Sequence, residues 1–266
     1  MRLVLLFLMM WLLAPQAQAG ERILALSPHA CEILADIGAA DEIVGVVDYC
    51  DFPESLSKLP NLGGYNRIQV EAAMKLKPTL AIVMNDGAPA VNKLRALGVR
   101  VEASNPVTID AMLAEVERFG ALSGHQHEAA QQVHLLRARL ARLKPGHSQK
   151  SVKVFYEIWD DPLIAAGGSS LIHDVLTHLG LNNVFGAIAM EGPKVNIEAV
   201  VRAKPDLIIV AAGNEKVREQ FWKKWLGERV RVIGVNADLL HRPTPRLIDG
   251  MEALAARLSA GGGLHE

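Results

Sequence analysis

The feature that most limits the possible folds is an internal duplication. Residues 68–83 align without a gap to residues 195–210, so that position 71 corresponds to position 198 at a constant offset of 127. Each copy has a glutamate where a short helix should begin, a Lys-Pro pair that ends the helix, and an apolar run typical of a buried strand. A gapless match of this kind predicts two similar units, related by a pseudo-twofold axis, in the two halves of the chain.

Short apolar runs alternate with amphipathic stretches on both sides of the middle of the sequence. Strands are expected at 22–26, 43–47, 80–84, 99–101 and 152–156, with helices between them. This alternation is typical of parallel β-α-β units. We therefore expect an α/β fold with two Rossmann-like lobes, each built on a parallel sheet.

The middle of the sequence has a different pattern. Residues 109–143 are almost all helix-forming, apart from Ser123-Gly124, and apolar residues from Ala129 to Leu143 recur at intervals of three and four. We interpret this region as one long helix that joins the two lobes. The predicted organisation is an N-terminal lobe at 20–122, a connecting helix at 123–145 and a C-terminal lobe at 146–266.

The first residues indicate export. Arg2 precedes an apolar run at 3–13, and Ala17-Gln18-Ala19 stands before Gly20, which predicts a cleavable signal peptide at 1–19 and a periplasmic protein. The apolar run is shorter than the roughly 20 residues of a spanning helix, and no cysteine follows the cleavage site to carry a lipid. Export permits a disulfide between the two cysteines, Cys31 and Cys50, although their spacing alone does not prove one.

Composition and motifs argue against several classes of function. Half of the residues are apolar, the formal net charge is −1, and no basic cluster supports nucleic-acid binding. Nucleophile-elbow, phosphate-loop and dinucleotide motifs are missing, so the sequence predicts neither an enzyme nor a resident cofactor. The glycine-rich turn at 166–170 could bind an anion before the next helix, but we favour a tight turn with a serine cap.

Nine histidines raise the question of a metal. His125, His127 and His134 cluster in sequence and could bind a transition metal at the surface. We favour solvated polar residues, because the cluster lies at the start of an exposed helix. His29 follows the first strand, where open α/β sheets place their ligands, yet a lone histidine there is more often a hydrogen-bonding group. We expect no metal site.

Large aromatic side chains are scarce, so their positions are informative. Tyr49, Tyr65 and Trp159 are each expected in a loop beside the end of a strand, whereas Trp222 and Trp225 share a helix and are expected in the core. Partial burial at a lobe surface would account for the first three. We favour ligand contact for Tyr65 and Trp159, since an exposed aromatic residue in a Gly- or Pro-bounded loop has little structural reason to be there.

The duplicated glutamates, Glu71 and Glu198, have two interpretations. A carboxylate in the first turn of a helix stabilises that helix by roughly 0.3–1 kcal/mol, which would explain both residues. Alternatively, two carboxylates at equivalent places on two lobes could dock on matching basic residues of a two-subunit membrane partner, since such charges set orientation and association rate. The residues alone leave both interpretations open.

Several segments resemble one known family. They are Leu26-Ser-Pro-His-Ala-Cys-Glu32 after the first strand, Val44 to Pro53 with Asp48-Tyr49-Cys50-Asp51, and Gly63-Gly64-Tyr65 followed by Glu71 and Lys77-Pro78. Together they resemble the helical-backbone binding proteins of iron-chelate and vitamin B12 ABC importers. Residues 154–163 and 236–246 are most similar to the cobalamin-binding branch.

The resemblance implies a class III periplasmic binding protein fold, with two lobes that move little about one long helix and grip a ligand between them. It implies a corrinoid as the transported ligand, an ABC transporter permease dimer in the inner membrane as the partner of Glu71 and Glu198, and a monomeric protein. The ligand contacts that it implies are Tyr49, Tyr65, Met84, Trp159, Asp238 and Arg242.

Two departures keep other ligands open. Tyr65 and Met84 stand where some cobalamin binders carry tryptophan. Gly64-Tyr65-x-Arg67 also resembles haem-binding relatives, in which a tyrosine phenolate ligates iron. A haem or ferric-siderophore binding protein on the same fold is therefore the alternative, and an exported α/β enzyme is the alternative of another class.

Overall fold

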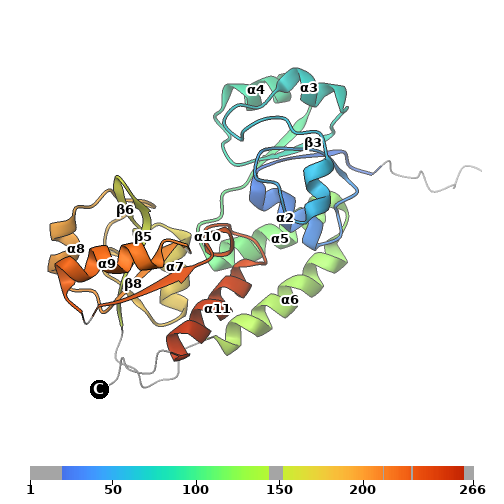
Figure 1. Ribbon diagram of the computed structural model, residues 1–266. Helices are drawn as coiled ribbons and strands as arrows, with labels where there is room; N and C mark the ends of the chain where they lie inside the picture. Colours follow the sequence, from blue (N-terminus) through green and yellow to red (C-terminus); the bar gives the residue numbers. More distant parts are fainter. Residues whose placement is uncertain (1–19, 144–151, 212, 229, 261–266) are drawn as a thin grey trace, which may run out of the picture.

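The computed structural model describes residues 20–143, 152–211, 213–228 and 230–260. They form two α/β lobes (Figure 1). The signal peptide expected at 1–19 lies outside the described residues. Among the helices of the described part, none has the length and apolar character that crossing a membrane requires.

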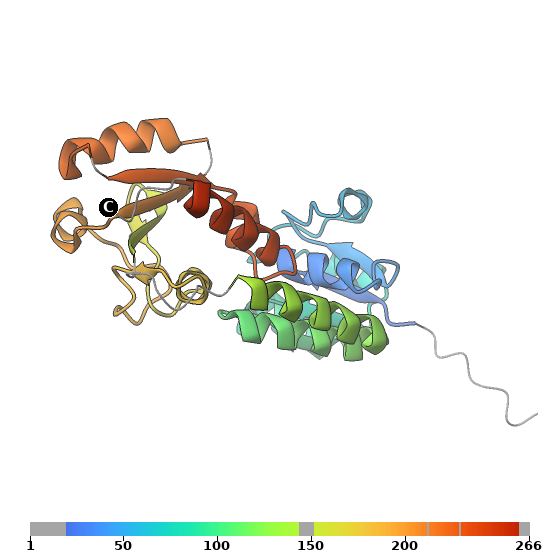
Figure 2. The same cartoon turned by 90° about the horizontal axis from the view of Figure 1, so that it is seen from below.

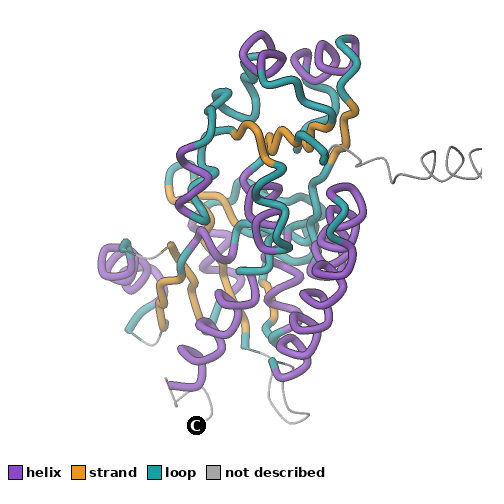
Figure 3. Tube along the Cα trace, turned by 90° about the vertical axis from the view of Figure 1, so that its right-hand side faces the viewer, coloured by secondary structure: helices purple, strands orange, loops and turns teal. Residues whose placement is uncertain are grey.

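The N-terminal lobe is built on a parallel sheet in the order β2-β1-β3-β4. Strands β1 and β3 are buried along their whole length, because helices lie on both sides of the sheet (Figure 3). Its strands are β1 (Ile23–Leu26), β2 (Ile43–Val46), β3 (Leu80–Val83) and β4 (Arg100–Ala103). Its helices are α2 (Pro28–Asp36), the short 3₁₀ helix η2 (Glu54–Lys58), α3 (Val70–Lys75) and α4 (Pro89–Ala96).

The C-terminal lobe repeats this plan. Strand β5 pairs in parallel with β7 and β8, β8 pairs in parallel with β9, and β6 is antiparallel, in a hairpin with β5. Its strands are β5 (Lys153–Asp160), β6 (Leu163–Ala165), β7 (Asn182–Asn183), β8 (Leu207–Ala211) and β9 (Arg231–Val235). Its helices are α7 (Leu171–His178), α8 (Ile197–Ala203), α9 (Glu215–Leu226), α10 (Ala237–Leu240) and α11 (Leu247–Ala260).

The duplicated segments adopt the same structure. The first contains α3 and β3, the second α8 and β8, and β3 and β8 each pair in parallel with the first strand of their lobe. Lys77 and Lys204, at equivalent positions before the prolines, both have a φ of 50°. Such a left-handed conformation is uncommon for a residue other than glycine, so the repeat extends to an unusual backbone feature.

The helical middle of the chain consists of two helices packed side by side, α5 (Ile109–Ser123) and α6 (Gln126–Arg142). The break falls at Gly124, whose φ of 85° ends α5 in a left-handed cap. Helix α6 buries Ala129, Val133, Leu136 and Leu140, which is the face that the spacing predicts. From its end the chain passes to the C-terminal lobe.

The last helix, α11, returns from the C-terminal half and lies beside α6 (Figures 1 and 2). Its residues Leu247, Ile248 and Met251 are fully buried in a core cluster that also contains the N-terminal sheet. Arg139 of α6 pairs with both Asp249 and Glu252 of α11 at 2.6 Å. Apolar packing and charge therefore both tie the two halves of the chain together.

Two expectations about tryptophans need correction. Trp159 lies within β5 rather than in a loop, because the antiparallel pairing of Trp159 with Ile164 of β6 extends the strand to Asp160. Of the two tryptophans expected in the core, Trp222 is fully buried against Phe155, but Trp225 is half exposed. Trp225 is therefore not a core residue.

Candidate functional site

The parallel strands of each sheet end at a common edge, and most of the predicted ligand contacts follow those ends. The register pairs Leu26 with Val83, so the chain after β1 and Met84 after β3 leave the N-terminal sheet side by side. Tyr49 follows β2, and Asp238 and Arg242 follow β9 in the other lobe. The carboxyl ends of parallel strands are where open α/β sheets bind their ligands.

A disulfide fixes the first of these segments. Cys31 in α2 is bonded to Cys50 in the loop after β2, with 5.8 Å between the Cα atoms, and both residues are buried. The disulfide that export permits between these two cysteines is therefore present in the structure. It places Glu32, the next residue in α2, near Asp51, the next residue in the loop.

Tyr49 has an unusual backbone conformation. Its φ is 66°, and its side chain is 70% exposed. The left-handed region costs roughly 1–3 kcal/mol for a residue other than glycine, and it persists only where the surrounding structure holds the residue there. Here the Cys50 amide donates to the carbonyl of Val47 at 3.3 Å, and the disulfide holds Cys50 itself. An exposed aromatic ring on a strained, covalently anchored turn is typical of a functional position.

The Tyr65 loop packs beside the Tyr49 turn. The amide of Asp48 donates to the carbonyl of Gly63 at 3.0 Å, and the Asn61 side chain donates to the Asp48 carboxylate at 3.1 Å. Gly63 must be glycine, because its φ is 93° and a Cβ there would lie 2.7 Å from the carbonyl oxygen of Arg67. Tyr65 is 38% exposed. Two of the predicted aromatic contacts therefore come from adjacent loops of one lobe.

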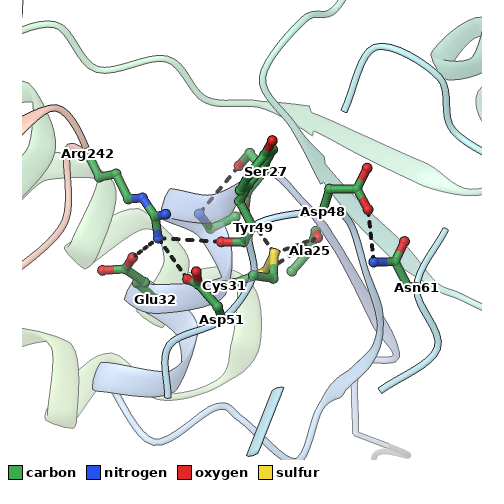
Figure 4. Close-up of a disulfide and its surroundings, with 11 residues drawn as sticks. Ala25, Ser27, Cys31, Glu32, Asp48, Tyr49, Asp51, Asn61 and Arg242 are labelled. Carbon is green, nitrogen blue, oxygen red and sulfur yellow. Dashed lines mark hydrogen bonds and ion pairs between the residues drawn. A yellow bond between two sulfur atoms is a disulfide. The ribbon is translucent and has the colours of Figure 1, made fainter. Parts of the chain in front are cut away.

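Arg242 joins the two lobes (Figure 4). Its Nη1 donates to Glu32 Oε1 at 2.9 Å, to Asp51 Oδ1 at 3.0 Å and to the Tyr49 carbonyl at 3.4 Å, and its Nη2 donates to Asp238 Oδ1 at 3.1 Å. Burial acts to lower the pKa of Arg242, but the hydrogen bonds to Glu32 and Asp51 outweigh it, so the pKa lies above its ordinary value. The guanidinium is charged at any relevant pH.

Glu32 connects this cluster to a second arginine. It is only 3% exposed, and its Oε2 lies 3.4 Å from Nη1 of Arg246, which follows Arg242 in the segment between α10 and α11. The Arg246 guanidinium also lies over the ring of Phe52, 3.7 Å from its centre. A cavity of about 300 Å³ is found here, lined by Glu32, Ala35, Asp36, Phe52, Pro53, Pro245 and Arg246. It has walls from both halves of the chain.

The remaining predicted contacts lie outside this cluster. Trp159 is 59% exposed at the tip of the β5–β6 hairpin, where its indole nitrogen donates to the carbonyl of Asp161 at 2.8 Å. Met84 is partly buried. Within the described residues neither side chain forms a hydrogen bond or ion pair with the Arg242 cluster. The hydrogen bonds of Arg242 thus bring Tyr49 and Asp238 together with it.

The two duplicated glutamates occupy equivalent places. Glu71 and Glu198 are exposed in the first turns of α3 and α8, at the ends of the two lobes that lie far from α6 (Figure 1). In the described part of the chain neither forms a salt bridge. Glu198 also borders a cavity of about 280 Å³ whose walls include Asp160, Arg218 and Phe221.

The other candidates have structural explanations. His29 is buried, its Nε2 lies 2.9 Å from Ser104 Oγ, and burial lowers its pKa to about 4, so the ring is neutral. Ser170 caps α7 by accepting from the His173 amide, which confirms the tight turn with a serine cap. No group of three or more potential metal ligands occurs among the described residues.

Glu32, Asp51 and Arg246 are site residues that the sequence pattern did not single out as contacts. The sequence did contain a signal for Glu32, namely a carboxylate in the middle of the apolar run Cys31 to Leu34. A buried acid needs a partner, so this position indicated an ion pair. Its partners lie about 210 positions away in the sequence.

Comparison with known proteins places the chain in a family. A family profile described as "Periplasmic binding protein" matches residues 23–224. The vitamin B12-binding protein of Yersinia pestis (strain Pestoides F) is 31% identical over 264 residues, which cover 95% of this chain and 91% of the relative.

Solved structures share the fold. The periplasmic vitamin B12 binding protein BtuF of Vibrio cholerae is similar with a TM-score of 0.74 at 28% identity, over 91% of this chain and 97% of that one. The apo form of the periplasmic heme-binding protein RhuT from Roseiflexus sp. RS-1 has a TM-score of 0.78 at 22% identity, over 92% and 100% of the two chains. The predicted fold, an α/β protein of class III, is confirmed. The chain belongs to the periplasmic binding protein family, and it is a solute-binding protein of ABC import rather than an enzyme.

Proposed function

We propose that the protein captures a corrinoid of the vitamin B12 type between its lobes and delivers it to an ABC transporter in the inner membrane. The observation that carries the proposal is the pairing of exposed aromatic rings with the Asp238–Arg242 pair at the strand ends. A corrinoid offers a flat apolar macrocycle with a polar rim of amides, which suits this combination. The 31% identity to vitamin B12-binding proteins supports the same choice.

In this proposal the lobes comprise residues 20–122 and 146–266, and a helix within 123–145 connects them. Tyr49 and Tyr65 contact one face of the ligand, and Trp159 contacts it from the other lobe, with Met84 as a further apolar contact. Arg242 and Asp238 bind its polar rim. Because Arg242 is already held by hydrogen bonds from both lobes, little ordering entropy is lost when the ligand arrives.

Delivery requires a docking surface. We propose that Glu71 and Glu198 bind basic residues on the two subunits of the permease. Their equivalence by sequence and structure supports this role, since one carboxylate on each lobe would match a twofold partner. A signal peptide at 1–19 would direct the chain to the periplasm.

A specific observation supports the alternative ligand. Tyr65 is exposed in Gly64-Tyr65-x-Arg67, where a phenolate could ligate haem iron. Haem-binding proteins share the fold, although at 22% identity that likeness is limited to the fold.

Absorption spectroscopy separates the two ligands. The protein is incubated with cyanocobalamin or with haemin and freed of unbound ligand by gel filtration. Retention of cyanocobalamin, with affinity reduced but not abolished in Tyr65→Phe, is the expected result. A shifted Soret band that disappears in Tyr65→Phe, together with no retained corrinoid, would establish haem as the ligand instead.

A further inference from the structure

The charges around Arg242 are the reverse of those in a typical anion site. Its guanidinium donates to three carboxylates, those of Glu32, Asp51 and Asp238. Arg246 supplies a second positive charge against Glu32. Three carboxylates therefore face two guanidinium groups, and the cluster carries one net negative charge.

Further carboxylates border the proposed contacts. Asp48 precedes Tyr49, and Asp160 and Asp161 follow Trp159; all three are exposed. His241 adds no positive charge, because burial lowers its pKa and its Nε2 lies 2.9 Å from the hydroxyl of Tyr156. Arg67, in the Tyr65 loop, is a basic residue that opposes this trend.

The hydrogen-bonding capacity of Arg242 points in the same direction. Nη1 already serves Glu32, Asp51 and the Tyr49 carbonyl, and Nη2 serves Asp238. Within the described residues, Nε and the second N–H of Nη2 have no acceptor. These donors suit a neutral oxygen such as that of a carboxamide. A ligand carboxylate in the same place would lie beside carboxylates that already share the guanidinium charge.

We propose that Glu32, Asp51 and Asp238 make the Arg242 site selective for tetrapyrroles that carry carboxamides over tetrapyrroles that carry carboxylates. The inference rests on the proposed function for the placement of the macrocycle against Arg242. Cyanocobalamin carries neutral amides around its ring, whereas haem carries two propionates. The same carboxylates thus orient Arg242 and exclude anionic ligands, which is specificity through an unfavourable interaction with the wrong partner.

The expected discrimination follows from Coulomb's law. For one added carboxylate about 7 Å from a net negative charge, at an effective dielectric constant between that of water and that of a protein surface, the affinity should fall roughly tenfold. Because Asp51 and Asp238 are exposed, added salt should reduce this factor.

The test compares two ligands that differ by one charge. Calorimetry measures the affinity for cyanocobalamin and for its monocarboxylic acid derivative, in which one peripheral amide is hydrolysed. Wild type should favour the amide about tenfold. The double variant D51N/D238N leaves one carboxylate facing two guanidinium groups, so it should lose this preference and favour the monocarboxylic acid. Asp41→Asn, an exposed acid outside the cluster, is the matched control and should keep the wild-type ratio. Glu32 is left intact because its substitution is expected to destabilise the fold.

A ratio near one in wild type, or an unchanged ratio in D51N/D238N, would overturn the inference. If neither corrinoid binds, the proposed function fails, and the selectivity is then tested with haemin and its dimethyl ester. Tighter binding of the ester by wild type but not by D51N/D238N would support the carboxylate selectivity without the corrinoid. Equal binding, or tighter binding of the free acid, would overturn that as well.

Discussion

Replacing Glu32 with alanine should destabilise the protein strongly. Glu32 is 3% exposed and is the common partner of Arg242 at 2.9 Å and Arg246 at 3.4 Å, whose side chains are 15% and 24% exposed. Removing one partner of a buried pair costs about 3–5 kcal/mol, because the remaining charge loses its compensation. Arg242 keeps Asp51 and Asp238, which are more exposed, so the lower end, about 3 kcal/mol, is expected.

Urea unfolding followed by circular dichroism measures this change. Glu32→Gln keeps the shape and one acceptor oxygen, so it should cost less than alanine, by about 1 kcal/mol or more. Glu117→Ala, an exposed glutamate on α5, is the matched control and should change the free energy of unfolding by less than about 0.5 kcal/mol. A loss below about 1 kcal/mol in Glu32→Ala would refute the view that this carboxylate holds the lobes together.

Three further predictions concern the same region. Replacing Cys31 and Cys50 together with alanine should lower the free energy of unfolding by about 3 kcal/mol, because the bond restricts the conformations of the unfolded chain. An unchanged urea midpoint would contradict this. Tyr49→Gly should relieve the left-handed strain and raise stability by about 1 kcal/mol while weakening ligand binding, whereas Tyr49→Ala should weaken binding without the gain in stability; equal stability of the two variants would count against strain. His29, with a pKa lowered from 6.5 to about 4, stabilises the fold above pH 6.5 and loses that contribution as pH falls toward 4. The destabilisation caused by His29→Gln should therefore be smaller at pH 4.5 than at pH 7.5. An equal destabilisation at both pH values would show that the lowered pKa of His29 does not contribute to stability.

Local signals predicted the framework of the fold. The duplication correctly predicted two equivalent helix–strand units. This succeeded because a Lys-Pro pair ends a helix, and an apolar run forms a buried strand, through interactions between residues that are close in sequence. The weak point at Ser123-Gly124 corresponds to the turn between α5 and α6, since glycine readily adopts the left-handed cap that ends a helix.

Long-range contacts explain what the sequence pattern missed. Trp159 belongs to a strand only because β6 pairs with it, and α11 belongs to the N-terminal core only because its apolar face meets α6. The role of Glu32 depends on arginines about 210 positions away. No local periodicity contains such information.

The most direct test of the central claim is a calorimetric titration of the purified protein with cyanocobalamin. We expect saturable binding at one site per chain, weakened by Arg242→Ala and by Tyr49→Ala but not by Glu71→Ala or Glu198→Ala. The absence of heat with cyanocobalamin, alongside saturable binding of haemin or a ferric chelate by the same sample, would contradict it.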